Sequence, residues 1–517
     1  MNIYQWFIFF LGVQLIHYLG TWKLYEKAGR KSWEAGIPIY NSIVLMKIIN
    51  RPTWWTFLLF IPIINLIMFP VIWVETLRSF GRRSTLDTFL GIVTCGLYIY
   101  YVNYTQEVIY STERDTTAVS KTGDTVSSLL FAIIVATFVH TYFIQPFTIP
   151  TASLEKSLLI GDFLFVSKMN YGARVPMTTV AAPMVHDTLP LIHTKSYLKW
   201  PQLPYFRFPG IEKIKNNDIV VFNWPVDTVE KFFDTSGRKA DKPVDKKSNY
   251  VKRCVGIAGD SLAIKDGIVF VNGKELIFPE RAKPQFSYKM AIDPETSIDF
   301  ESLFKELDIT DRYGINNTKD TIYFSALPAT SVERFKNVPG IKSVTRIIHK
   351  EIDKSIFPHT ENWNVDNFGP IYIPQAGKTV ALNLETLPFY SRIITEYEKN
   401  KLEIKGSDIY INGAKIKSYT FQQNYYWMMG DNRHNSEDSR YWGYVPEDHI
   451  VGKPIFIWMS WDSNGVGIMN KIRWNRLFTT VSGKGQPQSF FKYFLGLLAL
   501  YFVGEYFWKK RKADKKV

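Results

Sequence analysis

The residue of this chain that is best placed to carry out a reaction is Ser153, which follows an extended, proline-containing stretch at 147–150. That stretch continues directly from an apolar run at 126–144, which is about as long as a bilayer-spanning helix requires. At roughly 3.3 Å per residue, the link from Gln145 keeps the serine hydroxyl within about 25 Å of the lipid. Chemistry at Ser153 would therefore take place at a membrane surface, on a substrate that the membrane presents.

A serine hydroxyl is a poor nucleophile until a base takes its proton. The sequence has no apparent Ser/His/Asp set, but a lysine can serve once its pKa falls from about 10.4 toward 7, at a cost of roughly 4 to 5 kcal/mol in burial. Lys252 has a suitable setting, because it lies in a strand-like run with Tyr250, Val251 and Cys254. A lone lysine in an apolar strand is also typical of a sheet edge, where its charge prevents the strand from pairing with another chain. Composition leaves both this edge-guard interpretation and the catalytic interpretation open.

Three segments together resemble the type I signal peptidase family, the membrane serine proteases that remove signal peptides from exported proteins. They are the serine segment, the lysine strand and the run MGDNRHNSEDSRYWG at 429–443, which is long and specific. Two further matching segments, 161–168 and 218–222, stand in the family's order. The resemblance extends from about residue 147 to residue 453 and is interrupted by a polar insertion.

This resemblance implies which residues carry the reaction. Ser153 matches the nucleophile and Lys252 matches the general base. Ser436 matches a serine whose hydroxyl orients the lysine. The hydroxyl of Thr151 and the backbone N–H of Ser153 are implied as the oxyanion hole.

The resemblance also implies residues that support the site and bind the substrate. Asp438 and Arg440 match the supporting pair. Shallow apolar pockets in the family admit small side chains at positions −1 and −3 of the signal peptide and exclude bulky ones by overlap. The matching pocket residues are Phe147, Ile149, Pro150, Leu154, Leu158, Tyr250 and Val251.

Three positions depart from the family's usual pattern. Thr151 stands where the family usually has serine, Lys156 replaces a proline, and His434 replaces an aspartate. Losing the side-chain half of the oxyanion hole would cost on the order of 3 kcal/mol of transition-state stabilisation. We expect activity to survive, because Thr151 keeps a hydroxyl.

Two alternative functions remain. Ser153 and Lys156 also form an S-x-x-K match, the nucleophile motif of penicillin-binding proteins and class A β-lactamases. However, the K-T-G at 121–123 precedes the serine, and no S-D-N follows it. The other alternative is a catalytically silent membrane scaffold that binds a partner such as the export machinery, although intact Ser153, Lys252 and Ser436 argue against silence.

Five apolar segments are predicted to cross a membrane, at 3–19, 54–73, 86–101, 126–144 and 490–507. Basic residues mark the cytoplasmic side of a membrane helix, and none precedes the first segment. The residues that follow it are Lys23, Lys27, Arg30 and Lys31, which is the reverse of a secretory signal peptide. We therefore predict that residues 147–488 lie outside and that the basic tail at 509–517 is cytoplasmic.

The predicted fold class is a helical membrane region plus a mainly-β extracytoplasmic catalytic domain of the signal peptidase type. Asn-Gly and Asp-Gly pairs within 265–274 and 406–415 predict β-hairpins, and the polar segment 281–367 reads as an insertion with a helix near 300–307. The predicted domains are a multi-pass membrane module at 1–125, a transmembrane helix at 126–146, the protease domain at 147–488, a second transmembrane helix at 489–508 and a basic cytoplasmic tail at 509–517.

The net charge of +14 is concentrated in the terminal basic cluster and otherwise scattered, so nucleic-acid binding is not expected. The two cysteines and eight histidines show no metal-ligand spacing, and no metal or cofactor is expected. The resemblance implies signal peptides of exported precursors as the substrates. It also implies contacts with membrane lipids, the export machinery as a candidate partner, and the inner membrane of a bacterium as the location, with the catalytic domain on the periplasmic side.

Overall fold

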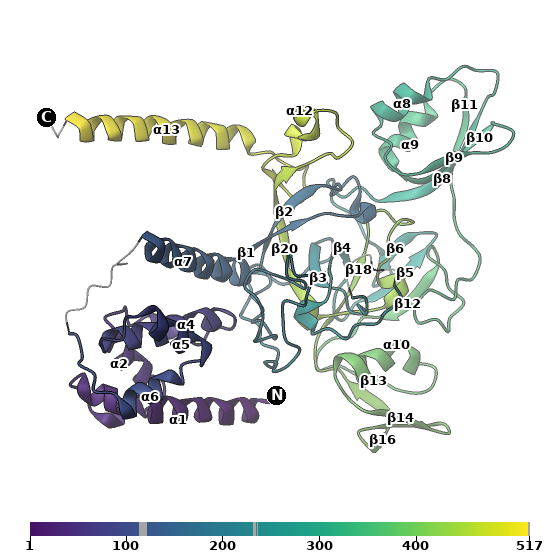
Figure 1. The fold of residues 1–517 in the computed structure, drawn as a ribbon. Coiled ribbons are helices and arrows are strands. Elements are labelled where there is room, and N and C mark those ends of the chain that lie inside the picture. The colour runs from purple at the N-terminus through teal and green to yellow at the C-terminus, as the bar shows by residue number, and fades with distance from the viewer. Residues whose placement is uncertain (113–120, 231–233, 235, 515–517) are drawn as a thin grey trace. The chain divides into compact units, whose positions relative to one another are not determined.

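The chain begins with a long helix, α1 (Ile3–Lys27), whose start is closed by a capping box between Asn2 and Gln5. The computed structural model describes residues 1–112, 121–230, 234 and 236–514 (Figure 1). By packing, these residues divide into two units. The first comprises Met1–Phe143, Ala173–Phe208 and Thr228–Lys247, and the second comprises the other described residues.

The first unit is mainly helical and has its own apolar core. Its remaining helices are α2 (Tyr40–Ile48), α3 (Trp55–Leu58), α4 (Ile64–Ser79), α5 (Thr85–Val93), α6 (Tyr98–Thr105) and α7 (Lys121–Tyr142). Leu24, Val44 and Met68 are among the buried residues of that core. A Cβ at Gly20 would lie 2.6 Å from the ring of Tyr100, so α1 and α6 approach closely at this glycine.

Two of these helices, α1 and α7, are long and apolar enough to cross a membrane. The pair α5 and α6 would add a third span if it acted as one, although its two helices meet at 119°. The predicted crossing at 54–73 is interrupted, because α3 ends at Leu58 and α4 begins at Ile64. Two or three of the described helices are therefore long and apolar enough to span a membrane, and the five predicted crossings stay a prediction.

The predicted C-terminal anchor is a helix, α13 (Phe491–Asp514), whose apolar side chains are largely exposed. Its apolar run is interrupted by the charges of Lys492 and Glu505, and it is not among the helices that meet the requirements for a span. Its role as an anchor stays a prediction. The last part of the basic tail, 515–517, lies outside the described residues.

The second unit is built around an eight-stranded sheet, whose strands include the recognised segments at 162–167 and 219–223 and the strand of Lys252. Its strands run in the order β1-β2-β20-β3-β4-β18-β19, and β21 pairs with β20. Their bounds are β1 (Ile144–Thr148), β2 (Asp162–Ser167), β3 (Ile219–Asn223), β4 (Asn249–Gly256), β18 (Tyr425–Met429), β19 (Val445–Pro446), β20 (Ile450–Ser460) and β21 (Thr479–Thr480). All neighbouring strands in this sheet pair in the antiparallel direction.

Both predicted hairpin segments form hairpins. The first belongs to a sheet of β5 (Ser261–Lys265), β6 (Ile268–Val271), β7 (Lys274–Glu275) and β12 (Phe368–Tyr372), and the second is β14 (Leu402–Lys405), β15 (Asp408–Ile411) and β16 (Ala414–Ile416). At the turn between β15 and β16, Asn412 and Gly413 have φ of 51° and 84°. Both residues adopt the left-handed conformation that a two-residue hairpin turn requires, which is why Asn-Gly predicts it. A further pair of strands is β13 (Thr379–Ala381) with β17 (Ser418–Thr420).

The insertion folds as a small α/β body with a separate apolar core. Its sheet has the order β11-β8-β10-β9, formed by β8 (Gln285–Ile292), β9 (Tyr313–Ile315), β10 (Thr321–Pro328) and β11 (Ile341–Arg346). Two helices, α8 (Phe300–Glu306) and α9 (Ala329–Lys336), belong to it, and α8 confirms the helix predicted near 300–307. The remaining helices of the unit are α10 (Leu387–Arg392), α11 (Ser439–Trp442) and α12 (Ile468–Lys471). Apolar N-terminal helices and a largely β second unit confirm the predicted fold class, while the side of the membrane stays a prediction.

Candidate active site

Ser153 lies on a single turn of 3₁₀ helix, Ala152–Leu154, immediately after the extended residue Thr151. Its side chain is nearly buried, with 7% of the residue exposed. The turn is held from below by Asn432, whose backbone N–H donates to the Ser153 carbonyl at 3.1 Å and whose side-chain amide donates to the Ala152 carbonyl at 3.2 Å. The segment at 151–157 is here called the nucleophile loop, after the predicted role of Ser153. Its position therefore depends on the 429–443 segment.

Lys252 lies in the middle of the main sheet, on β4, where its register partner on β3 is Val220. Only 3% of the residue is exposed, and in the part of the chain that the structure describes its amine has no hydrogen-bond or ion-pair partner. The Lys252 Nζ lies over the ring of Tyr250, 5.7 Å from its centroid. A central strand excludes the edge-guard interpretation, which needs an exposed sheet edge.

Burial is the main influence on Lys252 and lowers its pKa from 10.5 to about 8. The negative charges of Asp438 and Glu437 act in the opposite direction and limit the fall. Desolvation disfavours the charged ammonium, so a substantial fraction of this lysine is neutral near pH 8. The side chain thus has the property that a general base requires.

Gly430 is the point at which the three candidate catalytic positions converge. A Cβ built there would lie 2.2 Å from the hydroxyl oxygen of Ser436 and 2.5 Å from the backbone oxygen of Ser153. The register of β18 with β4 pairs Met429 with Arg253, so Gly430 and Lys252 are the next residues along the two strands. Glycine is required here because any side chain would occupy the space between the serine loop and Ser436.

The Ser436 hydroxyl is buried and, among the described residues, has no hydrogen-bond partner. The bond to Lys252 that the resemblance implies is therefore not formed in this conformation, and its formation stays a prediction. Thr151 is partly exposed and has extended backbone angles, φ −133° and ψ 154°. Its predicted place in the oxyanion hole likewise stays a prediction.

Asp438 and Arg440 form a buried two-bonded ion pair, as their predicted supporting role requires. The guanidinium donates from Nε and Nη2 to the two carboxylate oxygens at 2.9 and 2.8 Å. Burial opposes the charge of Asp438, but the charge and hydrogen bonds of Arg440 outweigh it and lower the pKa of the carboxyl. The same carboxylate accepts the backbone N–H of Gly430 at 3.0 Å, so the pair fixes the glycine.

The predicted pocket residues do not all lie together. Ile149, Leu154 and Leu158 belong to one buried apolar cluster, against which Phe147 and Val251 are packed. Tyr250 belongs to a different cluster, because adjacent residues of β4 face opposite sides of the sheet. There its ring stacks on Trp224 at 5.0 Å, whereas Pro150 is exposed and belongs to neither cluster.

Lys156, the rival base of the S-x-x-K interpretation, is engaged elsewhere. Its amine forms an ion pair with the carboxylate of Asp308 at 2.7 Å and also donates to the Asp308 carbonyl. Its backbone has φ of 67°, which places the residue in the left-handed region. This geometry gives Lys156 a contact with the insertion and none with the Ser153 hydroxyl.

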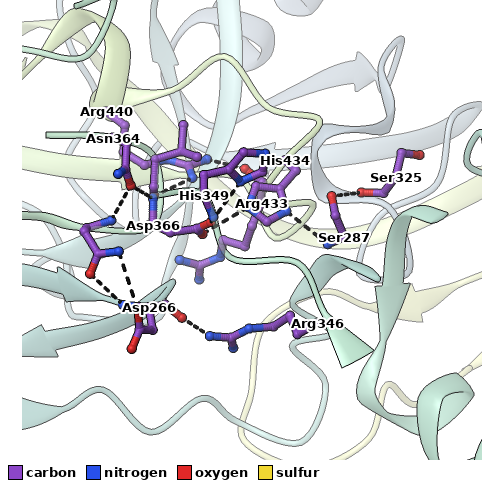
Figure 2. Close-up of polar contacts among 12 residues, drawn as sticks. Asp266, Ser287, Ser325, Arg346, His349, Asn364, Asp366, Arg433, His434 and Arg440 are labelled. Atoms are coloured by element: carbon purple, nitrogen blue, oxygen red, sulfur yellow. Dashed lines mark hydrogen bonds and ion pairs between the residues drawn. The ribbon is translucent and has the colours of Figure 1, made fainter. Parts of the chain in front are cut away.

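His434 forms a polar cluster with His349 and Asp366, shown in Figure 2. The His434 Nδ1 accepts the backbone N–H of Ser287 at 3.0 Å, so Nε2 carries the proton and donates to Asp366 Oδ1 at 3.0 Å. His349 reaches the other oxygen of Asp366 at 2.9 Å. Burial opposes the charge of Asp366, but these bonds outweigh it and lower its pKa to about 2.

The same three side chains each offer one ligand atom within 4.8 Å of the others, which is close enough to hold a metal ion. Metal at Nε2 of His434 would move the ring proton to Nδ1, where the N–H of Ser287 already points. Two donors would then face each other, whereas a metal-bound histidine needs an acceptor at its second nitrogen. The cluster therefore fits a hydrogen-bonded clamp better than a metal site.

Sequence reasoning missed the importance of several residues in this region. Gly430 was part of the recognised segment, but nothing in the sequence indicated that it separates Ser153 from Ser436. Arg253, which the sequence assigned no role, donates two hydrogen bonds to buried Asp431, at 2.7 and 2.6 Å. The one sequence signal for this pair is the placement of an arginine next to the lysine in an otherwise apolar strand.

Comparison with known proteins agrees with the geometry. A family model described as signal peptidase, peptidase S26, matches residues 122–313 and 377–461. The chain therefore belongs to the signal peptidase family, and the segment left out between the two matched ranges falls largely within the insertion. A second model, described as a family of unknown function (DUF5684), matches residues 33–113, within the predicted membrane module.

Curated relatives support the same assignment. A signal peptidase I from Buchnera aphidicola is 27% identical over 348 residues, which cover 67% of this chain and 78% of the relative. A signal peptidase I from Haemophilus influenzae is 26% identical, covering 70% and 77%. One from Helicobacter pylori is 25% identical, covering 69% of this chain and 92% of the relative.

Proposed function

We propose that this protein is a signal peptidase I, a membrane-anchored serine endopeptidase that cleaves N-terminal signal peptides from exported precursor proteins. The observation that carries the proposal is the convergence at Gly430 of the Ser153 loop and Ser436, where Gly430 and buried Lys252 follow the Met429–Arg253 register pair on neighbouring strands. This arrangement occurs in a chain that belongs to the signal peptidase family.

In the proposed reaction the neutral amine of Lys252 takes the proton of the Ser153 hydroxyl, and the oxygen attacks the scissile carbonyl. The Ser153 N–H and the Thr151 hydroxyl stabilise the resulting oxyanion. The Lys252 ammonium then gives its proton to the departing amine of the mature protein, leaving an ester on Ser153. Lys252 next deprotonates water, which hydrolyses the ester and restores the serine, while Ser436 orients the amine throughout.

The supporting charges hold this arrangement without taking part in proton transfer. Asp438 and Arg440 fix the backbone at Gly430, and the negative charge of Asp438 keeps the pKa of Lys252 from falling further. The small pocket at −1 is proposed at the cluster of Ile149, Leu154 and Leu158 with Phe147 and Val251. Because the first three are almost fully buried, the substrate would contact chiefly the exposed parts of the last two.

The membrane setting is part of the proposal. The two long apolar helices support anchoring in a lipid bilayer, and the basic residues after α1 support a cytoplasmic location for that end of the helix. We propose the inner membrane of a bacterium, with the protease unit on the periplasmic side. Membrane lipids and the protein export machinery are proposed partners of the helical module. The domain boundaries predicted from the sequence are also part of the proposal.

The penicillin-binding interpretation is less well supported, because Lys156 is paired with Asp308 instead of facing Ser153. The decisive experiment uses the full chain in detergent with a precursor protein that has alanine at −1, and follows cleavage on gels. Ser153→Ala and Lys252→Ala should each abolish cleavage, and the double variant should be no worse, because the two groups act as one unit. Lys156→Ala should keep most of the activity.

The matched control is Lys405→Ala, which removes an exposed lysine of β14 and should leave cleavage unchanged. Turnover by Lys252→Ala together with an inactive Lys156→Ala would assign the base to Lys156. Undiminished cleavage by Ser153→Ala would reject the enzyme, and a silent wild-type chain would favour the scaffold. Replacing alanine by leucine at −1 of the precursor should block cleavage, and equal cleavage of both would reject the small-pocket assignment.

A further inference from the structure

The insertion, residues 281–367, contacts the nucleophile loop through the Asp308–Asp311 turn, which connects α8 to β9, and near its start through Lys283 and Gln285. Asp311 is the centre of this contact. Its carboxylate accepts the side-chain amide of Asn432 at 3.1 and 3.2 Å and that of Asn435 at 2.9 Å. Asn432 also donates to the carbonyls of Ala152 and Ser153. Asp311 is therefore hydrogen-bonded to the residue that fixes the backbone at Ser153.

This contact also dictates the orientation of the Asn432 amide. Its Nδ2 donates both to Asp311 and to the Ala152 carbonyl, while its Oδ1 is buried and, within the described part of the chain, has no partner. The reversed amide would place Oδ1 against a carboxylate and a carbonyl, so three acceptors would meet without a proton. Asp311 therefore selects the orientation in which Asn432 donates to the nucleophile loop.

The same turn contacts the loop directly. Asp308 pairs with Lys156, and the Thr310 hydroxyl donates to Glu155 Oε1 at 3.3 Å. The Asp308 side chain is 69% exposed, so its ion pair contributes less than the enclosed bonds of Asp311. Burial raises the pKa of Glu155 to about 7, and the charges of Asp311 and Asp308 act in the same direction.

The two ends of the insertion are attached to the catalytic segment as well. Gln285 N–H donates to the Asp431 carbonyl at 2.8 Å, and Arg433 N–H donates to the Gln285 carbonyl at 3.0 Å. At the other end, Asp366 accepts a bond from His434, which in turn accepts one from Ser287. The two ends of the insertion, here called its stems (residues 285–287 and 366), are thus hydrogen-bonded to the segment that follows Gly430.

These contacts account for two of the three departures from the family's sequence pattern. Lys156 pairs with Asp308 of the insertion, and His434 connects Ser287 to Asp366 across its stems. Unusual residues at both positions are therefore matched to partners inside the insertion. An insertion without contacts to the site would leave positions 156 and 434 free to carry the proline and aspartate that are usual in the family.

We propose that the insertion positions the nucleophile, and that Asp311 is the positioning residue through which it acts. The inference rests on the proposed signal peptidase function. Asp311 orients Asn432, and Asn432 holds the Ala152 and Ser153 carbonyls, so the turn helps to fix the backbone that carries the Ser153 hydroxyl. Asp311 touches neither substrate nor the reacting atoms, and its effect is on the rate of the bound complex.

The test compares Asp311→Ala and Asp311→Asn in the full chain with the same precursor, measuring kcat, KM and the thermal melting temperature. Asp311→Ala should lower kcat on the order of tenfold or more with KM changed less than about threefold, because a small displacement of a reacting group costs rate rather than binding. Asp311→Asn should recover most of the loss, since one amide oxygen still accepts from Asn432. The control, Glu306→Ala, breaks the Arg334–Glu306 pair on the same insertion and should leave kcat unchanged.

A wild-type kcat for Asp311→Ala would overturn the inference. Equal losses in Asp311→Ala and Asp311→Asn, each accompanied by an equal fall in melting temperature, would also overturn it and leave a merely structural role. Where Asp311→Ala does not fold, a Lys156→Glu/Asp308→Lys exchange decides: recovery relative to Lys156→Glu supports positioning by the turn, and no recovery contradicts it. Activity in Ser153→Ala would reject the proposed function itself, whereas an inactive Ser153→Ala with a normal Asp311→Ala rejects only this inference.

Discussion

The segment at 429–443, here called the catalytic box, and the insertion at 281–367 carry their charges in opposite ways. In the box Asp431 pairs with Arg253 of β4, and Asp438 pairs with Arg440; all four side chains are buried, and each pair has two hydrogen bonds. Most ion pairs of the insertion lie on its surface, and the exception is buried Asp366, which pairs with His434 of the box. The Arg334–Glu306 pair, for example, has side chains 47% and 55% exposed.

The difference follows from what each region does. A buried pair is costly to form, and it is even more costly to leave one partner alone, so the box tolerates few changes and holds one arrangement. Exposed pairs are screened by water and contribute little, so the insertion can vary without losing its fold. The insertion meets the box and takes part in its hydrogen bonding at the Asp308–Asp311 turn and at its two ends.

The largest effect is expected at Gly430. Gly430→Ala places a methyl group against the Ser153 carbonyl and the Ser436 hydroxyl, so the serine loop must move and cleavage should fall at least on the order of a hundredfold. The measurement is precursor cleavage by the purified chain. Its control in the insertion is Gly314→Ala, where nothing lies within 4 Å of the new Cβ and activity should be normal. An active Gly430→Ala would contradict the close approach of the Ser153 loop and Ser436 at this glycine, and with it the view that the box tolerates few changes.

The next effect concerns stability. Arg253→Ala leaves Asp431 buried without its charge partner and should lower the free energy of unfolding by about 3 to 5 kcal/mol. The equivalent change in the insertion, Arg334→Ala, should cost less than about 1 kcal/mol. Denaturant unfolding of both variants measures the contrast. Similar losses in the two variants would show that burial does not separate the regions.

At the junction of the two regions, Glu155 should make stability depend on pH. Burial raises its folded pKa from 4.5 to about 7, so the folded protein binds this proton more tightly than the unfolded chain. The destabilisation is absent below pH 4.5, grows between pH 4.5 and 7, and is complete above pH 7. Glu155→Gln should therefore raise the free energy of unfolding by about 3 kcal/mol at pH 8 and have no such effect at pH 4. Glu333→Gln, on the exposed surface of α9, is the control, and a gain that is equal at both pH values would contradict the assignment.

The smallest effect is the pH dependence of the reaction. The base is the neutral form of Lys252, whose pKa burial lowers to about 8, so cleavage should rise about fiftyfold between pH 6 and pH 8 at limiting substrate. The profile of kcat/KM against pH measures this limb. His434→Asn should keep its midpoint near pH 8. A limb that disappears in His434→Asn would assign the pH dependence to the histidine of the box instead.

Local features of the chain could be predicted from the sequence because they depend on neighbours. The Asn-Gly and Asp-Gly turns need only the left-handed conformations of two adjacent residues, and these turns form as predicted. The helix of the insertion near 300–307 also forms, at Phe300–Glu306. Membrane crossings were less predictable, because run length does not reveal the break between α3 and α4 or the 119° bend between α5 and α6.

The sequence by itself determined the residue types of the site, since Ser153, Lys252 and the 429–443 run can be recognised in the order in which the family carries them. Only the tertiary structure decided how those residues are used. The fall in the pKa of Lys252 depends on being enclosed in a central strand, and the need for glycine at 430 depends on two segments meeting from distant parts of the chain. The partners of Lys156 and His434 lie 152 and 68 residues away, at Asp308 and Asp366. Burial and pairing over such separations are properties of the packed molecule, which no local pattern encodes.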